Sequence, residues 1–183
     1  MTPGCSLIKL EITSAIVIIL CLCAAEPQDR QPKASRLPAV FTPVLADVKA
    51  ECHLPILLPS ELPKPIADAQ HALMQRTTAD RYSIELYYEL EIGDAGFAAT
   101  FAGESKPKYS ASELGRKVEL AHGISGSFRP VSCGGSCAPV NLWWEVNGIL
   151  YTVQLRLSSS SSEKSQQETI TAVASSAILA GPR

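Results

Sequence analysis

Residues 140–157 read VNLWWEVNGILYTVQLRL, and this stretch carries the strongest fold signal in the chain. Asn147 and Gly148 favour the positive φ angles of a type I′ turn, so the residues on either side are expected to pair as a β-hairpin. In this register the alternate pairs are all apolar: Val146 with Ile149, Trp144 with Tyr151, Leu142 with Val153, and Val140 with Leu155. One face of the hairpin is therefore expected to be buried.

The other face of the hairpin is mostly polar. It carries Asn141, Trp143, Glu145, Leu150, Thr152, Gln154 and Arg156. A strand pair with one apolar and one polar face is typical of an antiparallel sheet that is covered on one side and solvated on the other.

The composition favours one folded domain. The chain has 183 residues, of which 46% are hydrophobic and 19% are charged, enough for one core but short for two. The net charge is −2 and no run of lysine or arginine occurs. Nucleic acid is therefore not expected as a partner, because nucleic-acid binding requires a basic surface.

Residues 1–25 have the pattern of a signal peptide or an N-terminal membrane segment. Ile12–Ala25 is a run of apolar and small residues preceded by Lys9, and Cys23, Ala24 and Ala25 provide the small residues read by a signal peptidase. Cleavage before Glu26 is the preferred interpretation.

Two alternatives for this segment are open. Acylation of Cys21 or Cys23 would make a lipoprotein, although leucine precedes each cysteine where a small residue is usual. An uncleaved anchor would run over residues 7–25, which is marginal against the roughly 20 apolar residues that span a bilayer. Each alternative places the folded part outside the cytoplasm, in the periplasm or cell envelope, either secreted or anchored, with membrane contact only through this segment.

Residues 26–40 are rich in proline and charge and are predicted to be a linker, leaving 41–183 as a single α+β domain. A short helix is predicted to run to about Glu51, with Thr42 as its N-cap and Pro43 at its first helical position. His53–Pro59 is interpreted as a short edge strand because its prolines cannot donate to a central ladder. Ser60–Ala79 is ambiguous and mildly helical.

Residues 82–92 alternate apolar and polar side chains and predict a long strand. Gly93–Gly96 is expected to turn the chain, after which Phe97, Ala99 and Phe101 continue the inward-facing set. A second strand pair is predicted at residues 117–120 and 124–128, on either side of a turn at residues 121–123.

The last element is predicted to be a helix that lies on the sheet. Ser160 and Glu163 have the spacing of a capping box, and Gly181 ends the helix. Its apolar stripe consists of Ile170, Val173, Ala174, Ala177 and Ile178. The expected fold class is α+β: an antiparallel β-sheet built of hairpins, with a C-terminal helix packed on one face and a short N-terminal helix.

Three cysteines lie in the predicted domain, namely Cys52, Cys133 and Cys137. In an oxidising compartment Cys133 and Cys137 could close a small loop, or Cys52 could pair with one of them. Binding of a metal through the Cys133/Cys137 loop is an alternative that needs further ligands, such as His53, His122 or Cys52. No metal ligand set and no cofactor is predicted, because no CxxC pair or cofactor motif occurs.

No catalytic residue is predicted, because the chain lacks a nucleophile elbow, a His-Glu-x-x-His motif and a phosphate-binding loop. The enzyme alternative is an envelope hydrolase with dispersed catalytic groups, such as His122 with Asp94 or Glu119. A histidine in a turn is the simpler interpretation of His122.

The candidate binding residues are Trp143, Tyr87 and Glu145, all on the polar faces of their strands. Aromatic side chains on a solvated sheet often mark recognition surfaces. Packing beneath the linker or against Leu150 is the equally weighted alternative.

Four stretches carry a resemblance to known proteins: LLPSELP at residues 57–63, VSCGGSCAP at 131–139, LWWEVNGILYTVQL at 142–155 and AGPR at 180–183. The chain resembles a group of bacterial exported, lipoprotein-like proteins, and is similar to the extracytoplasmic domains of some anti-sigma-factor-like proteins. The resemblance covers roughly residues 55–183. It implies a fold and an extracytoplasmic location, but no catalytic residues.

Together these features predict an exported cell-envelope protein that is a non-enzymatic binding or assembly module. Its expected partner is an envelope protein or ligand whose identity the sequence does not specify.

Overall fold

The computed structural model of the protein describes residues 36–91, 93–134 and 136–183. The predicted signal or membrane segment, and the linker up to residue 35, lie outside the described residues. Three short 3-10 turns at Ala39–Phe41, Gly93–Gly96 and Ala121–Gly123 are referred to below as η1, η3 and η5. The helices and strands are α1 Thr42–Glu51, β1 His71–Thr78, β2 Arg81–Tyr87, β3 Phe97–Glu104, β4 Arg116–Glu119, β5 Ser125–Arg129, β6 Ser132–Cys133, β7 Cys137–Ala138, β8 Val140–Val146, β9 Ile149–Leu155 and α2 Glu163–Ala180.

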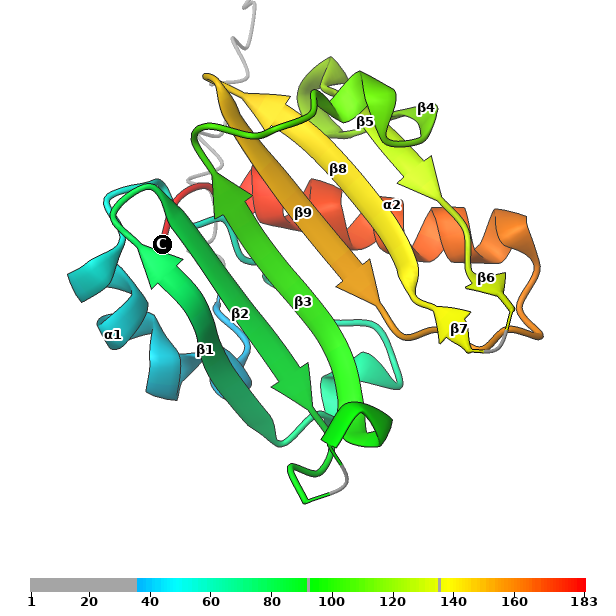
Figure 1. The fold of residues 1–183 in the computed structure, drawn as a ribbon, viewed down its shortest axis with the longest axis horizontal. Helices are drawn as coiled ribbons and strands as arrows, with labels where there is room; N and C mark the ends of the chain where they lie inside the picture. Colours follow the sequence, from blue (N-terminus) through cyan, green and yellow to red (C-terminus); the bar gives the residue numbers. More distant parts are fainter. Residues whose placement is uncertain (1–35, 92, 135) are drawn as a thin grey trace, which may run out of the picture. The chain divides into compact units, whose positions relative to one another are not determined.

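Seven strands form one antiparallel sheet in the order β1-β2-β3-β9-β8-β5-β4, while β6 and β7 form a separate small hairpin. Figure 1 looks onto one face of the sheet, with α2 behind β8 and β9 and α1 beside β1. The expected fold class is therefore confirmed, with its C-terminal helix and its short N-terminal helix.

The central hairpin of the sheet has the predicted register. Trp144 pairs with Tyr151, and the other three apolar pairs are also as expected. Asn147 and Gly148 have φ angles of 53° and 74°, so the turn uses the left-handed conformation that these residues adopt most readily.

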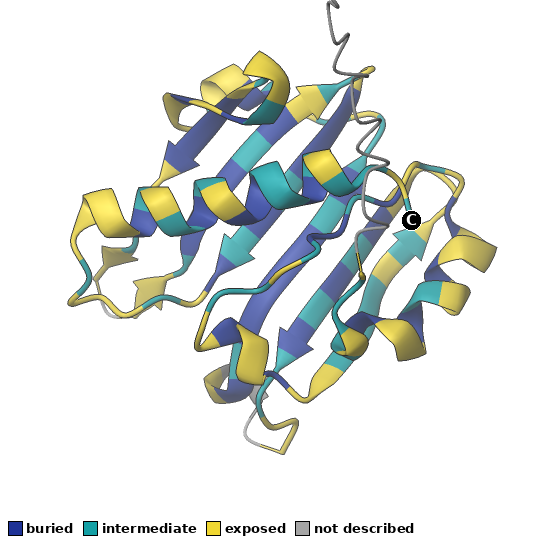
Figure 2. Ribbon diagram, turned by 180° about the vertical axis from the view of Figure 1, so that it is seen from behind, coloured by how far each residue is buried: buried dark blue, intermediate teal, exposed yellow. Residues whose placement is uncertain are grey.

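Helix α2 covers the apolar face of this hairpin (Figure 2). Four residues of its predicted stripe are buried, namely Ile170, Val173, Ala174 and Ala177, and Ile178 packs against the core from a partly buried position. The hairpin residues Val140, Leu142, Trp144 and Val153 belong to the same core and are at most 1% exposed. The helix and the hairpin thus bury each other's apolar surface.

The residue that caps α2 differs from the prediction. The helix begins at Glu163, and Ser162 is its N-cap, whose Oγ accepts a hydrogen bond from the amide of Ser165. Ser160, predicted as the cap, instead exchanges a hydroxyl hydrogen bond with Ser158. In a run of five serines every residue has the chemistry of a cap, so the choice depends on where the helix docks on the sheet.

The segment at residues 53–59 is not the predicted edge strand. Only Leu57 forms a β-bridge, with Pro182 near the C-terminus. The segment crosses the covered face of the sheet, where the Tyr82 hydroxyl accepts from the Leu57 amide at 3.0 Å and the Tyr151 hydroxyl donates to the Pro55 carbonyl at 3.2 Å. Buried tyrosine hydroxyls therefore satisfy backbone groups that a strand partner would otherwise satisfy.

The ambiguous segment at residues 60–79 contains a strand that its sequence did not reveal. His71–Thr78 forms β1 at the edge of the sheet and pairs with β2. Its inward residues Ala72 and Met74 are good helix formers, so the local propensity of this segment favours a helix. Pairing with β2 overrides that preference and makes the segment a strand.

Strand β2 is shorter than predicted, and this changes the positions of Leu90 and Phe97. A register shift lies between Leu86 and Tyr87, after which Tyr87 pairs with Phe97. Phe97 therefore lies on the same face as Tyr87 and outside the core, contrary to the prediction. Leu90, also predicted to face inward, is 42% exposed. Ile92 lies outside the described residues.

Helix α1 ends at Glu51 as predicted but begins one residue early, at Thr42, so that Phe41 and not Thr42 is its N-cap; Val44 and Val48 of the helix are buried. Phe41 directly before it packs edge-on against Phe101 of β3, with ring centroids 5.2 Å apart. The η1 turn and α1 thus cover the part of the sheet that α2 does not. Within the residues that the structure describes, no helix combines the length and apolarity needed to cross a membrane.

Candidate functional site

Among the described residues no α-helix packs on the face of the sheet opposite α2, and we call it the open face (Figure 1). A short 3-10 turn, η4 at Ala111–Glu113, contacts β5 and β8 and lines a hollow on this face. The antiparallel pairings align its side chains in rows that cross the strands. The Trp143 row crosses all seven strands and consists of Gln75, Ser83, Ala102, Thr152, Trp143, Ser127 and Lys117. The neighbouring Asn141 row consists of Leu73, Glu85, Thr100, Gln154, Asn141 and Arg129.

Trp143 lies near the middle of its row and is half-buried. The guanidinium of Arg129 lies over its ring, 5.2 Å from the ring centroid, and also donates to the carbonyl of Leu114 at 2.7 Å. This cation–π contact holds the indole in place on a largely polar surface.

Tyr87 belongs to the open face but not to the surroundings of Trp143. Its hydroxyl donates to the carboxylate of Glu85 at 2.7 Å, and its ring meets that of Phe97 edge-on at 6.0 Å. Tyr87 lies on β2 and Trp143 on β8, which are three strand steps apart in the sheet order. At about 4.8 Å per step, roughly 14 Å separates the two residues across the sheet.

Glu145 is exposed and lies two residues beyond Trp143 on the same face of β8. It pairs with Leu150, which in turn pairs with Glu104, whose carboxylate forms an ion pair with Arg81. The structure thus brings Trp143 and Glu145 together and leaves Tyr87 at another corner of the open face.

Two hollows flank Trp143. The first, of about 460 Å³, is lined by Gln75, Arg76, Ser83, Glu85, Thr100, Ala102, Thr152 and Gln154. The second, of about 480 Å³, lies over β4, β5 and the end of β8, with Lys117, Ser127 and Glu145 in its lining. Trp143 pairs with Thr152 of the first hollow and with Ser127 of the second. The indole therefore lies between the two hollows.

The polar side chains around Trp143 have free hydrogen-bonding groups. In the described part of the chain, the side chains of Gln75, Ser83, Thr100, Ser127, Thr152 and Gln154 make no hydrogen bond to another protein group. The sequence did not predict Ser83, Thr100 or Ser127 as site residues, because only the pairing of distant strands reveals that they share one surface. Strand alternation alone places each of them on the face opposite the core, where Ser83 is partly exposed and Thr100 and Ser127 are 8% and 3% exposed.

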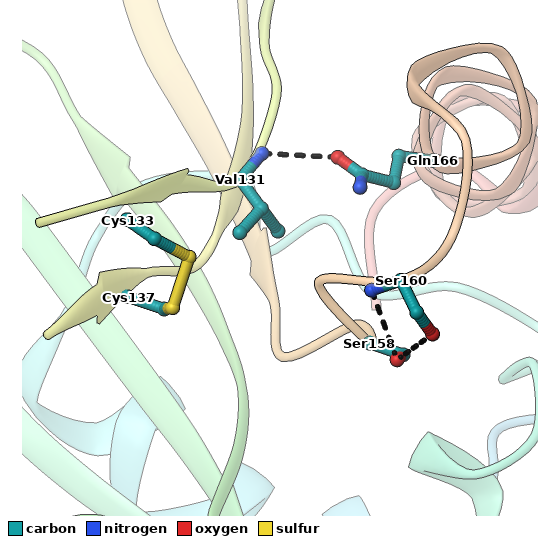
Figure 3. The surroundings of a disulfide bond; sticks show 6 residues. All are labelled: Val131, Cys133, Cys137, Ser158, Ser160 and Gln166. Atoms are coloured by element: carbon teal, nitrogen blue, oxygen red, sulfur yellow. Dashed lines mark hydrogen bonds between the residues drawn. A yellow bond between two sulfur atoms is a disulfide. The ribbon is translucent and has the colours of Figure 1, made fainter.

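The disulfide between Cys133 and Cys137 closes the small β6–β7 hairpin (Figure 3). Gln166 of α2 holds the start of this hairpin, because its Oε1 accepts from the Val131 amide at 3.0 Å while its Nε2 donates to the Ser161 carbonyl. Of the two predicted pairings, the one that leaves Cys52 free is the one found. A disulfide is compatible with an oxidising, extracytoplasmic compartment.

Cys52 lies in the core and is 4% exposed. Burial raises the pKa of its thiol, which keeps the sulfur protonated and unreactive. Among the described residues, no group of three or more histidine, cysteine, aspartate or glutamate side chains is placed to hold a metal ion.

Of the two carboxylates in the hydrolase alternative, Asp94 lies far from His122, while Glu119 ends β4 close to it in the chain. His122 is exposed in η5 at the end of the sheet that carries the Asn147–Gly148 turn, whereas Asp94 belongs to η3 at the opposite end. In the described part of the chain His122 makes no hydrogen bond or ion pair with Glu119. Its φ of 59° fits the predicted role of a turn residue.

Comparison with known proteins does not identify a relative: no family model matches the chain, and no curated protein or solved structure matches it.

Proposed function

We propose that the protein is an exported module of the cell envelope that binds a ligand or partner through the open face of its sheet and carries out no catalysis. The observation that carries this proposal is the open face itself. It presents uncharged polar side chains with unused hydrogen-bonding groups on both sides of a fixed indole. Solvated strand faces with aromatic residues and free polar groups are suited to recognition.

Two features support the proposed compartment. The apolar segment at residues 12–25 has the composition of a signal peptide, and the Cys133–Cys137 disulfide needs an environment in which thiols oxidise. Fractionation of cells that express the chain tests this part. The proposal requires the mature protein outside the cytoplasm, and a chain with an intact N-terminus in the cytosolic fraction contradicts it.

Photo-cross-linking in living cells tests the binding surface. A photoreactive amino acid replaces Thr152, which lies on the open face beside Trp143, and in a matched control it replaces Glu168, which is exposed on α2. The expected result is an adduct that forms from position 152 and not from position 168. Equal adducts from both positions, or none from either, argue against the open face as the binding surface.

Enzyme assays test the proposed absence of catalysis. Purified mature protein is incubated with generic ester, glycan and peptide substrates over a range of pH. Hydrolysis with a bell-shaped pH profile that His122→Ala abolishes would establish the hydrolase alternative in place of the binding function.

A further inference from the structure

We propose that the ligand of the open face is an extended, uncharged, polyhydroxylated chain, that is a neutral glycan, which crosses the strands along the Trp143 row. This inference rests on the proposed binding function and specifies its ligand class. The accessible part of the row runs from Gln75 through the first hollow to Trp143 and spans four strand steps, whereas Ser127 beyond it is only 3% exposed. At about 4.8 Å per step this is a track of roughly 19 Å, suited to a chain of several sugar rings.

The hydrogen-bonding chemistry of the row matches that of sugar hydroxyls. A sugar hydroxyl both donates and accepts, and so do the hydroxyls of Ser83, Thr152 and Ser127 and the amide of Gln75. None of these groups is used within the described part of the protein. Gln75, Ser83 and Thr152, which are partly exposed, can therefore exchange water for a ligand hydroxyl without breaking an internal bond, whereas Ser127 is only 3% exposed.

The charges around the first hollow favour an uncharged ligand. Its charged lining residues are Arg76 and Glu85, which are of opposite sign. The row from Ser83 to Ser127 contains no charged residue, and Lys117 at its far end shares the second hollow with Glu145. Arg129 is the charged group beside the middle of the row, where it lies over the Trp143 ring. A phosphate-bearing or otherwise anionic chain would need several basic groups along the track.

Trp143 supplies the aromatic surface of the row that a sugar ring needs. Arg129 covers one face of the indole, so the C–H face of a pyranose would pack on the other face, while its hydroxyls reach the polar groups in the first hollow. A protein partner fits less well, because specific protein interfaces are built around an apolar, aromatic core. An extended peptide also fits less well, because it binds a sheet by backbone hydrogen bonds. The backbone N–H and C=O groups of the strands under the open face already bond to neighbouring strands.

Titration with soluble neutral oligosaccharides tests the inference. The probes are hexamers of β-1,4-linked glucose, α-1,4-linked glucose and β-1,4-linked N-acetylglucosamine, followed by amide chemical shifts of the full mature chain. At least one hexamer is expected to shift the amides of Thr152, Ser127 and Ser83 and to leave those of α2 unchanged. Its affinity should change little with salt, because the contact is uncharged.

Variants make this test specific. Trp143→Ala is expected to weaken binding by about tenfold, and Thr152→Val and Ser83→Ala by about threefold each. The control is Tyr109→Ala, an exposed aromatic residue in the β3–β4 connection, which should have no effect on binding. Unchanged thermal unfolding of Thr152→Val and Ser83→Ala separates lost binding from lost structure.

Other outcomes overturn the inference in distinguishable ways. If no hexamer binds but Thr152 still cross-links to an envelope protein in cells, the glycan inference fails and the proposed binding function stands. If a polyanionic chain binds with strong salt dependence and the neutral hexamers do not, the ligand class is wrong. If neither hexamers nor cross-linked partners are found, the proposed function fails as well.

Discussion

Trp144 and Tyr151 stack across the β8–β9 hairpin, with ring centroids 5.5 Å apart and ring planes inclined by 20°. Both rings belong to the core on the covered face of the sheet and are at most 2% exposed. The next residue, Trp143, points to the open face and is half-buried. Two adjacent tryptophans thus have opposite roles, one in the core and one at the candidate site.

Replacement of the two tryptophans is expected to have opposite consequences. Trp144→Ala should lower the free energy of unfolding by about 3–5 kcal/mol, because it leaves a cavity in a packed core. Trp143→Ala should cost much less stability and should instead impair binding at the open face. Urea unfolding of the two variants measures the difference, and a reversed order would mean that the β8 register is wrong by one residue.

Trp144→Phe provides an intermediate case. The indole Nε1 of Trp144 is buried and has no hydrogen-bond partner among the described residues. Phenylalanine removes this unsatisfied donor but keeps much of the ring, so Trp144→Phe should lower the free energy of unfolding by much less than Trp144→Ala does.

The parts of the fold that could be predicted from the sequence are those determined by interactions between residues close together in the chain. Asn147-Gly148 sets the register of the hairpin, and the stripe from Ile170 to Ile178 sets the face of α2. What the sequence did not predict depends on distant contacts. His71–Thr78 becomes a strand because β2 pairs with it, and residues 53–59 cross the sheet because the hydroxyls of two buried tyrosines bind their backbone.

The candidate site was predictable only in part, for the same reason. Strand alternation assigned Trp143, Glu145 and Thr152 to one polar face, and Ser83 and Glu85 to another. That these are the same face follows from the pairing of β3 with β9, a contact between distant parts of the chain. Tyr87 is separated from Trp143 because β2 and β8 are not neighbours in the sheet.

The cap of α2 gives a further prediction. Ser162→Ala should destabilise the protein by about 1 kcal/mol, because it removes the side-chain acceptor for the Ser165 amide. Ser160→Ala is the matched control and should have a much smaller effect, since among the described residues its hydroxyl bonds only to the hydroxyl of Ser158. Thermal unfolding of the two variants compares their stability directly. An equal loss of stability in both would argue that Ser160 also caps the helix.

Alkaline pH should destabilise the fold through its buried tyrosines. Burial, and to a lesser extent the nearby Cys52, raises the pKa of Tyr151 to about 12, whereas a tyrosine in the unfolded chain titrates near 10. Between these values the unfolded state has lost a proton that the native state keeps. Stability contributed by the protonated hydroxyl is therefore fully present below about pH 10 and is lost as the pH rises toward 12.

The size of this effect follows from linkage. Each such tyrosine lowers the free energy of unfolding by up to about 1.4 kcal/mol per pH unit in this window. Burial also raises the pKa of Tyr82, so Tyr151→Phe should reduce the slope without abolishing it. Urea unfolding at several pH values between 8 and 11.5 measures the slope, and an identical slope in the variant would show that Tyr151 does not titrate differently on unfolding.

Thiol counting tests the cysteine pairing. A mature chain that begins at Glu26 holds Cys52, Cys133 and Cys137, so it should show one free thiol in denaturant without reductant and three after reduction. In the native state Cys52 should react slowly, because it is 4% exposed and burial raises its pKa. Reduction should lower the free energy of unfolding by at most about 2 kcal/mol, since the disulfide closes a very short loop. The sheet should persist, because α2 still holds Val131 through Gln166. Three thiols without reductant would show that Cys133 and Cys137 are unpaired and would remove the disulfide as support for an oxidising compartment.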